Sequence, residues 1–333
     1  MATVVGARPN GLNEHRISST QFGDAHVATG ELKKRDRFED YVVGALHHGE
    51  VGEMGLDVLV HSNLPAQAGL SSSASVLVAS LACFLQLRGV KWTPYEVALG
   101  AKEIENNFVG VPCGFMDQFA CACSLSGFAS LLDCADNSFI EVPASFDDAS
   151  WLVVYSGIRR TLAGGGYAAR VEMLKGAISK VDAAAGLGRD FPRFLQQDDM
   201  AKLGQEVGLL EQEVNLLKHV CAENYRVHAM RHALEKRDEE GAATLLNLGH
   251  RSLSELFGVS TRAVDDICRQ ALDINGVLGM RLTGAGMGGS LIALARLGQM
   301  DEAVEELGRI VAPAGGAVYR IPAFHKGVEI WKP

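Results

Sequence analysis

The feature that most constrains this chain is the segment LPAQAGLSSSASVLVAS at residues 64–80, where a glycine and three serines precede a long apolar run. Serine is a mediocre helix former in general but suits the first turn of a helix. A glycine followed by small hydroxyl side chains leaves backbone N–H groups uncovered at the helix start. Because those groups and the helix dipole attract negative charge, the segment predicts a helix over 72–88 that begins at an anion-binding turn.

Composition limits the classes of protein to be considered. The 333 residues are enough for two domains, and a net charge of −9 argues against a nucleic-acid binder. The seven cysteines form no zinc-type pairs, and the chain shows no signal peptide. The uncharged stretch 62–87 contains Pro, Gly and several Ser, so it does not predict a membrane span. We expect a cytoplasmic, soluble protein; its oligomeric state cannot be read from the sequence.

The N-terminal part reads as a mixture of strands and helices. Two β-rich runs, 3–8 and 16–22, surround Asn10-Gly11, a pair typical of hairpin turns. A strand is predicted at 56–63, and Thr93-Pro94-x-Glu96 is typical of a capped helix start. Further predicted elements are a helix at 113–124 and strands at 129–134 and 138–142.

The chain becomes polar around 144–150 before the apolar strand WLVVYSG, and we place the domain boundary there. This gives an N-terminal domain at 1–148 and a C-terminal domain at 149–333. Helical periodicity covers 168–185, 191–239 and 240–258. The segment GMRLTGAGMGGSLIALARL reads as strand, glycine loop and strand.

Two common nucleotide-binding motifs are excluded. No lysine follows the glycine–serine turn, as a Walker loop requires. The pattern GxGxxG occurs at Gly284, Gly286 and Gly289, but a strand rather than a helix is predicted after it, which argues against a dinucleotide-binding fingerprint. His228 and His232 lack the intervening glutamate of a zinc protease and read as surface residues.

Several motifs together resemble the GHMP kinases and, within them, the galactokinases. A proline, a glycine and a serine run open a helix at 65–74, and VGVPCG-x-MDQF follows at 109–119. The likeness continues through SGIRRTLAGGGY (156–167), HVCAENYRVHAM (219–230) and RLTGAGMGGS (281–290). The resemblance implies an α+β GHMP kinase fold, with an N-terminal domain like domain 2 of ribosomal protein S5 and a ferredoxin-like C-terminal domain.

The resemblance also implies roles for individual residues. ATP phosphates would bind at Gly69, Leu70, Ser71, Ser72, Ser73 and Ala74, and Mg²⁺ at Ser73 and Glu105. Asp117 matches the catalytic aspartate, which accepts or orients the proton of the attacking sugar hydroxyl. The sugar would contact Gly114, Asp117 and Tyr167. A third-motif glycine loop, packed against the phosphate site, would comprise Gly284, Gly286, Gly288 and Gly289.

Each assignment has a simpler structural alternative. The serines at 71–73 could merely cap a helix, and Asp117 could be a helix N-terminal or ion-paired carboxylate. Glu105 could be a solvated residue on a helix face, and Tyr167 could be part of the core. Cys113 has no evident histidine partner, so we interpret it as a packing residue rather than a nucleophile.

The match fails at the start of the chain. Galactokinases begin with a motif of the form GRVNLIGEHTDY, whereas this chain opens with GARPNGLNEHRISS. Arg8, Asn10, Glu14 and His15 can be laid over it, but no TDY follows and the hairpin explains the segment. We expect the chain to start after that motif, which would leave one sheet edge unpaired. Ala168 also replaces the asparagine usual after the tyrosine.

The expected activity is therefore an ATP-dependent phosphorylation of the anomeric hydroxyl of galactose or a close relative. One alternative is a catalytically impaired, nucleotide- or sugar-binding regulator. Another is the same chemistry on arabinose, galacturonate or N-acetylgalactosamine. The expected partners are ATP, Mg²⁺ and a small sugar, with no nucleic acid and no membrane.

Overall fold

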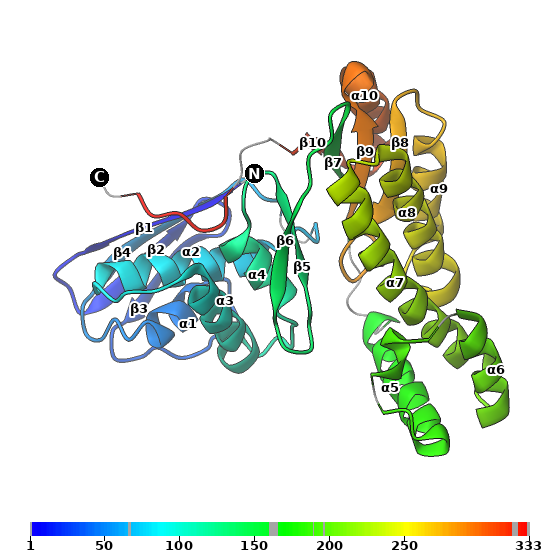
Figure 1. Cartoon of the computed structure of the whole chain (residues 1–333). Coiled ribbons are helices and arrows are strands. Elements are labelled where there is room, and N and C mark those ends of the chain that lie inside the picture. Colours follow the sequence, from blue (N-terminus) through cyan, green and yellow to red (C-terminus); the bar gives the residue numbers. More distant parts are fainter. Residues whose placement is uncertain are drawn as a thin grey trace. The chain divides into compact units, whose positions relative to one another are not determined.

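The computed structural model describes residues 2–65, 68–159, 166–188, 190–195, 197–321 and 326–331. The chain divides into two compact units (Figure 1). Unit 1 comprises Met1–Ala66, Leu70–Glu141 and Ala323–Pro333, and unit 2 comprises Gln67–Gly69 and Val142–Pro322. The turn at residues 69–74, which we call the serine turn, therefore contains the point where the chain leaves unit 2 and re-enters unit 1.

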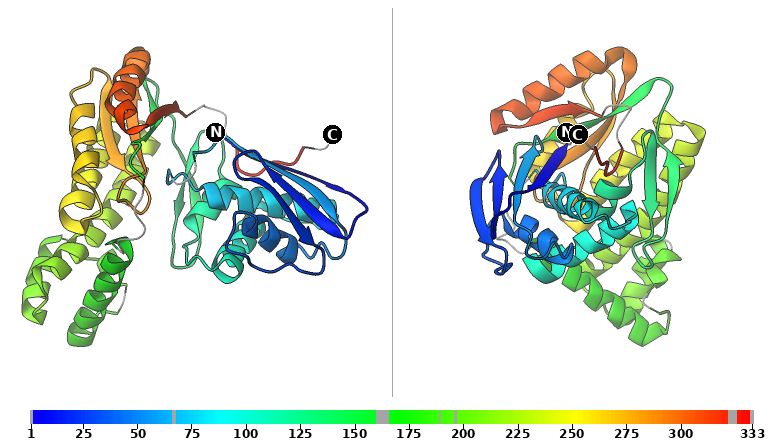
Figure 2. Two further views of the ribbon diagram at one scale, coloured as in Figure 1. Left: turned by 180° about the vertical axis from the view of Figure 1, so that it is seen from behind. Right: turned by 90° about the vertical axis from the view of Figure 1, so that its left-hand side faces the viewer.

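Unit 1 is built on a four-stranded sheet in the order β1-β4-β2-β3. Its strands are β1 (Thr3–Pro9), β2 (Glu14–Ser19), β3 (Gly23–Ala28) and β4 (Leu56–Ser62). One face of the sheet is covered by helices (Figures 1 and 2). The apolar side chains of these helices form the core of the unit. The helical segments are α1 (Asp40–His48), α2 (Ser72–Leu87), α3 (Pro94–Glu103), η1 (Ile104–Val109) and α4 (Met116–Cys123). A two-stranded sheet follows, formed by β5 (Phe128–Leu132) and β6 (Phe139–Pro143).

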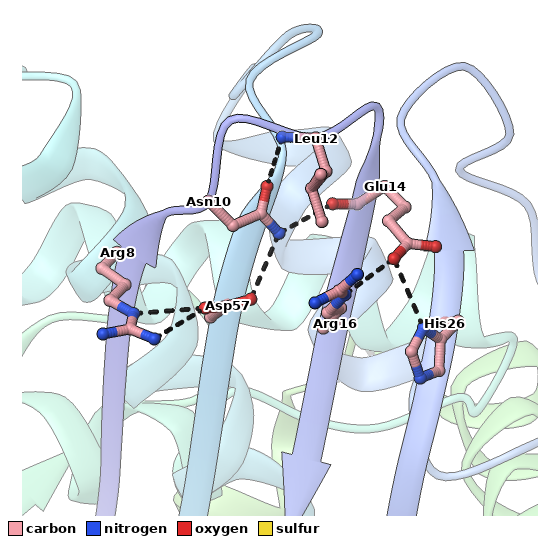
Figure 3. Close-up of polar contacts among 7 residues, drawn as sticks. All are labelled: Arg8, Asn10, Leu12, Glu14, Arg16, His26 and Asp57. Atoms are coloured by element: carbon pink, nitrogen blue, oxygen red, sulfur yellow. Dashed lines mark hydrogen bonds and ion pairs between the residues drawn. The ribbon is translucent and has the colours of Figure 1, made fainter.

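The hairpin predicted around Asn10-Gly11 is wrong. β1 and β2 do not pair with each other, because β4 lies between them, antiparallel to β1 and parallel to β2. The Asn10 side chain closes the connecting loop: its Oδ1 accepts from the Leu12 N–H at 2.8 Å, and its Nδ2 donates to the Glu14 carbonyl and to Asp57 (Figure 3). The Asn-Gly pair thus makes a turn that crosses over the start of β4.

The polar residues next to this loop form ion pairs and hydrogen bonds within the sheet. Arg8 pairs with Asp57 at 3.0 Å, and Glu14 accepts a hydrogen bond from Arg16 at 2.7 Å (Figure 3). His15 is fully buried, and burial lowers the pKa of its imidazole. Arg8, Asn10 and Glu14 thus have partners within the sheet and its loop, whereas neither ring nitrogen of His15 has a hydrogen-bond partner among the described residues.

Unit 2 contains an antiparallel sheet in the order β10-β7-β9-β8. Its strands are β7 (Ala149–Tyr155), β8 (Val277–Leu282), β9 (Ser290–Arg296) and β10 (Ala317–Arg320). Its α-helices are α5 (Gly166–Ala185), α6 (Gln197–Val207), α7 (Glu211–Lys236), α8 (Glu239–Ser252), α9 (Arg262–Ala271) and α10 (Met300–Val311). Short helical turns are η3 (Phe191–Arg193), η4 (Leu253–Phe257), η5 (Leu297–Gln299) and η6 (Ala312–Ala314). One core lies between the sheet and its helices, and a second joins α5, α6 and α7.

The helix predicted over 191–239 is three segments rather than one. Gly208, in the left-handed region at φ 73°, ends α6, and the Leu209 N–H bonds back to the Gly204 carbonyl at 2.9 Å. The next helix begins where the Glu213 side chain accepts from the Leu210 N–H. No helix in the described ranges is both long and apolar enough to cross a membrane.

Candidate functional site

The serine turn ends in an unusual helix start. Ser71, the residue before α2, has the left-handed conformation (φ 55°, ψ 36°), and its side chain does not cap the helix. Ser71, Ser72 and Ser73 are half-buried, whereas Ala74 is fully buried under the turn. The first N–H groups of an α-helix have no partner inside the helix, so this uncapped start can donate them to an anion.

Glu105 lies on the π-helical turn η1, which continues directly from α3. Single π-turns inside helices often occur at functional sites. The side chain is buried, with a residue exposure of 4%. Its hydrogen-bond partners are both neutral: the Gln118 amide donates to Oε2 at 2.5 Å, and the Cys113 thiol lies 3.6 Å from the same oxygen. The structure therefore contradicts the alternative of a solvated residue on a helix face.

A return loop brings Cys113 and Gln118 to this carboxylate. The Cys113 N–H donates to the Asn106 side chain at 2.8 Å, and the Val111 N–H donates to the Glu105 carbonyl at 2.9 Å. Gln118 is fully buried and also donates to the Cys113 sulfur at 3.3 Å. The segment after η1 thus folds back over η1, and its hydrogen bonds fix the orientation of the Glu105 side chain.

Asp117 lies in the first turn of α4 and is exposed, as is Gly114 just before the helix. Cys121 follows Asp117 by four residues, so the two side chains share one face of α4, with about 5–6 Å between their Cβ atoms. The Cys121 sulfur lies 4.0 Å from the Ser71 carbonyl oxygen. The face of α4 that carries Asp117 therefore packs against the serine turn.

The thiols between these groups are not nucleophiles. Burial raises the pKa of Cys113 to about 11, with a further contribution from the Glu105 carboxylate. Burial raises the pKa of Cys121 to about 12, and the charges of Asp117 and Glu105 both add to it. Both thiols stay protonated at neutral pH, which agrees with the interpretation of Cys113 as a packing residue. Asp117 and Glu105 both act on these thiols, so the two carboxylates lie near one another in unit 1.

The residues around Glu105 suit a hard cation. A buried carboxylate with neutral partners gains from an added positive charge, because an uncompensated buried charge is costly. Within the described ranges, no three His, Cys, Asp or Glu side chains gather into a metal centre. A cation at Glu105 would therefore be completed by hydroxyl, water or phosphate oxygens, the ligand set of Mg²⁺.

Unit 2 contains the glycine loop (residues 284–289) between β8 and β9. Gly286 and Gly288 have positive φ values of 80° and 115°, and a Cβ on Gly286 would lie 2.3 Å from the Val259 carbonyl oxygen. The buried Ser156 hydroxyl donates to the Gly289 carbonyl at 2.6 Å. Ser290, directly after the loop, donates to the Ala68 carbonyl at 2.8 Å. The loop is therefore tied to the residue that precedes Gly69.

Tyr167 is the second residue of α5 and is 46% exposed, so it is not a core residue. Its ring meets the Phe257 ring edge-on at 6.2 Å between centroids, and Phe257 in turn stacks on His219 at 4.6 Å. The preceding Gly166 lies against Met287 of the glycine loop, where a Cβ would approach the methionine methyl to 2.5 Å. Tyr167 thus lies beside the glycine loop within unit 2.

The structure collects the predicted residues into two groups. Unit 1 brings together Ser71–Ala74, Glu105 and Asp117, with Gly114 at the start of α4, and unit 2 brings together Gly69, Tyr167 and the glycine loop. Residues 160–165 of the motif SGIRRTLAGGGY lie outside the described residues. Sequence reasoning missed Gln118 and Cys121. A signal for both existed, since Gln118 adjoins Asp117 and Cys121 lies one helical turn after it.

Comparisons with known proteins agree along most of the chain. The family model for the GHMP kinases N terminal domain matches residues 40–124, and the model for the GHMP kinases C terminal region matches residues 230–313. A galactokinase of Thermococcus kodakarensis is 38% identical over 319 residues, which cover 93% of this chain and 84% of the relative. A galactokinase of Chloroflexus aurantiacus is 34% identical, with 90% and 77% covered.

Solved structures show the same fold. A galactokinase of Lactococcus lactis in complex with galactose superposes with a TM-score of 0.86 at 23% identity, covering 96% of this chain and 84% of that one. A mevalonate kinase from L. major, in complex with R-mevalonate, superposes with a TM-score of 0.65 at 22% identity, covering 96% and 85%. The α+β fold expected from the motifs is confirmed.

Proposed function

This chain belongs to the GHMP kinase family, and on that premise we propose that it transfers the γ-phosphoryl group of ATP to the anomeric hydroxyl of galactose or a closely related sugar. The curated galactokinases, at 34% and 38% identity over most of their length, support this substrate class. The single observation that carries the proposal is the packing of Cys121 on Ser71, which joins the Asp117 helix to the serine turn.

The uncapped start of α2 would bind the nucleotide phosphates. Ser71 in the left-handed conformation followed by helical residues makes a concave run of N–H groups, the kind of backbone nest that binds anions. The positive end of the helix dipole adds a favourable interaction with phosphate charge. Small side chains at 71–74 allow close approach of the phosphates to the backbone.

Glu105 and the Ser73 hydroxyl would hold Mg²⁺, which, when bound, neutralises charge on the phosphate oxygens. The protein's own contribution is orientation. Gln118 and Cys113 occupy Oε2 of Glu105, which keeps the carboxylate in one position before substrate arrives. Outer partners of this kind commonly matter for metal affinity.

Asp117 would accept the proton of the attacking sugar hydroxyl as the new O–P bond forms. Its exposed position at the start of a helix leaves the carboxylate open to a substrate. General-base assistance of this kind is worth about 10²–10⁴ in rate, and alignment of the reacting groups supplies much of the remainder. Tyr167 and Gly114 are the proposed sugar contacts.

The proposal is tested by incubating the purified chain with Mg-ATP and one sugar at a time: galactose, arabinose, galacturonate or N-acetylgalactosamine. We expect ADP and sugar 1-phosphate in equal amounts with galactose or one of its relatives, and no ADP without sugar. If titration calorimetry detects ATP binding while no sugar is phosphorylated, the chain is a nucleotide-binding regulator and the proposal fails.

A further inference from the structure

The segment at residues 326–331, which we call the return segment, packs against α4. It belongs to unit 1, whereas the chain from Val142 to Pro322 belongs to unit 2. The Val328 N–H donates to the Ala122 carbonyl at 3.0 Å, and the Gly327 N–H donates to the Ser124 carbonyl at 2.7 Å. Val328 and Ile330 pack against the unit 1 core. The return segment thus binds the C-terminal end of the helix that carries Asp117.

The end of α4 needs such partners. The last carbonyl groups of a helix receive no hydrogen bond from within the helix. A helix as short as α4 is also unstable without tertiary contacts. The Ser124 hydroxyl bonds to the Ala120 carbonyl at 2.6 Å, and the return segment bonds to the carbonyls of Ala122 and Ser124. The return segment therefore completes the C-cap of α4 from more than 200 residues away in the sequence.

Gly327 is the critical residue of this contact. A Cβ at this position would lie 2.1 Å from the Ala122 carbonyl oxygen and 2.5 Å from its carbonyl carbon. Real Cβ atoms do not approach backbone atoms so closely, and neither backbone can move without shifting the other. Any residue other than glycine would therefore separate the return segment from α4.

We propose that Gly327 and Val328 are positioning residues for Asp117: they fix the C-terminal end of α4 and thereby the direction in which the helix presents its carboxylate. Buried side chains at Gln118, Phe119 and Ala122 hold the middle of α4. The return segment adds backbone hydrogen bonds at the C-terminal end, and a short helix that is also fixed at this end cannot tilt freely. A displacement of about 1 Å at the reacting group can cost about 10² in rate.

The inference rests on the proposed kinase function, and the test uses the full chain. Gly327→Ala introduces the clash, and Val328→Pro removes the N–H donor while the chain stays apolar. Gly308→Ala on α10, where a Cβ meets nothing within 4 Å, is the matched control. We expect both return-segment variants to lower kcat at least 10-fold with a smaller change in the KM for ATP, because the N–H groups of the serine turn belong to the start of α2 and not to α4. The control should behave as wild type.

A second measurement separates this inference from the proposed function. Backbone hydrogen exchange of α4 should speed up in Gly327→Ala and Val328→Pro but not in Gly308→Ala, whether or not any sugar is phosphorylated. Wild-type kcat in both variants, or equal losses of kcat and ATP affinity, would overturn the positioning role while leaving the kinase function intact. An inactive wild type with faster α4 exchange in the variants would overturn the kinase function and retain the contact.

Discussion

The buried Gln118 amide donates a hydrogen bond to the Glu105 carboxylate at 2.5 Å, across 13 residues of sequence. Gln118 is also the residue next to Asp117, so one short helix presents the proposed base outward and supports the proposed metal ligand inward. This arrangement would link the two proposed tasks, charge neutralisation at the metal ligand and proton acceptance at the base, through adjacent side chains.

Gln118→Leu removes the donor and keeps a side chain of similar size. We expect the Mg²⁺ concentration for half-maximal turnover, measured at saturating ATP and sugar, to rise about 10-fold or more, because the Glu105 carboxylate loses the partner that orients it. Gln86→Leu, near the far end of α2, should leave the Mg²⁺ dependence unchanged. A Gln118→Leu enzyme with the wild-type Mg²⁺ midpoint would show that the hydrogen bond does not serve a metal.

Substitutions at two serines in the first turns of α2 should have different effects, one on stability and the other on the Mg²⁺ dependence. Ser75 bonds to the Ser72 carbonyl and to Thr3, each at 2.8 Å, so Ser75→Ala should lower the free energy of unfolding by about 1 kcal/mol and leave kcat near wild type. Ser73→Ala should instead raise the Mg²⁺ midpoint at least about 10-fold with little change in stability. Urea denaturation and Mg²⁺ titrations of both variants make the comparison. The reverse pattern would remove Ser73 from the metal site.

The glycine loop gives a test of backbone constraint. Gly286→Ala combines a positive φ with a 2.3 Å approach to the Val259 carbonyl oxygen, and we expect a loss of about 2–4 kcal/mol in the free energy of unfolding. Gly315→Ala has a similar φ of 79° but open space around the Cβ, so only about 1 kcal/mol should be lost. Denaturant midpoints and slopes measure both. Equal losses would mean that conformation alone, and not the close packing of the loop, requires glycine.

Acid should destabilise the fold through His219. Burial lowers the pKa of this imidazole to about 4, from about 6.5 in the unfolded chain. Below pH 6.5 the unfolded state therefore binds more protons, and stability falls as pH falls. Between pH 6.5 and 5 the contribution of His219 is about 1.5 kcal/mol. His219→Gln should flatten the dependence of unfolding free energy on pH in this window, whereas His228→Gln, exposed on the same helix, should not. An unchanged slope in His219→Gln would contradict the shifted pKa.

Local signals in the sequence predicted much of the fold. The serine turn and the start of α2, the capping box at Thr93 and the strand–loop–strand around the glycine loop are found where they were expected. Each depends on neighbouring residues: a cap, a turn or a period. Gly208 carried such a signal too, and it could have placed the break between α6 and α7.

The parts that could not be predicted depend on segments far apart in the chain. Asn10-Gly11 indicates a turn correctly, but only the insertion of β4, some 40 residues later, decides that β1 and β2 are not neighbours. Gln118 adjoins Asp117 in the sequence, which is a local signal, but its contact with Glu105 depends on the fold. The contact of the return segment at 326–331 with α4 likewise cannot be read from either segment alone.

The central claim is that Asp117 accepts the proton of the sugar hydroxyl beside a triphosphate bound at the serine turn. Rapid-quench, single-turnover measurement of sugar phosphate formation by Asp117→Asn tests it most directly, with ATP affinity measured by calorimetry on the same protein. Asp24→Asn, exposed on β3, is the control. We predict that transfer by Asp117→Asn falls at least about 100-fold with ATP affinity near that of wild type. Transfer at the wild-type rate would contradict the account.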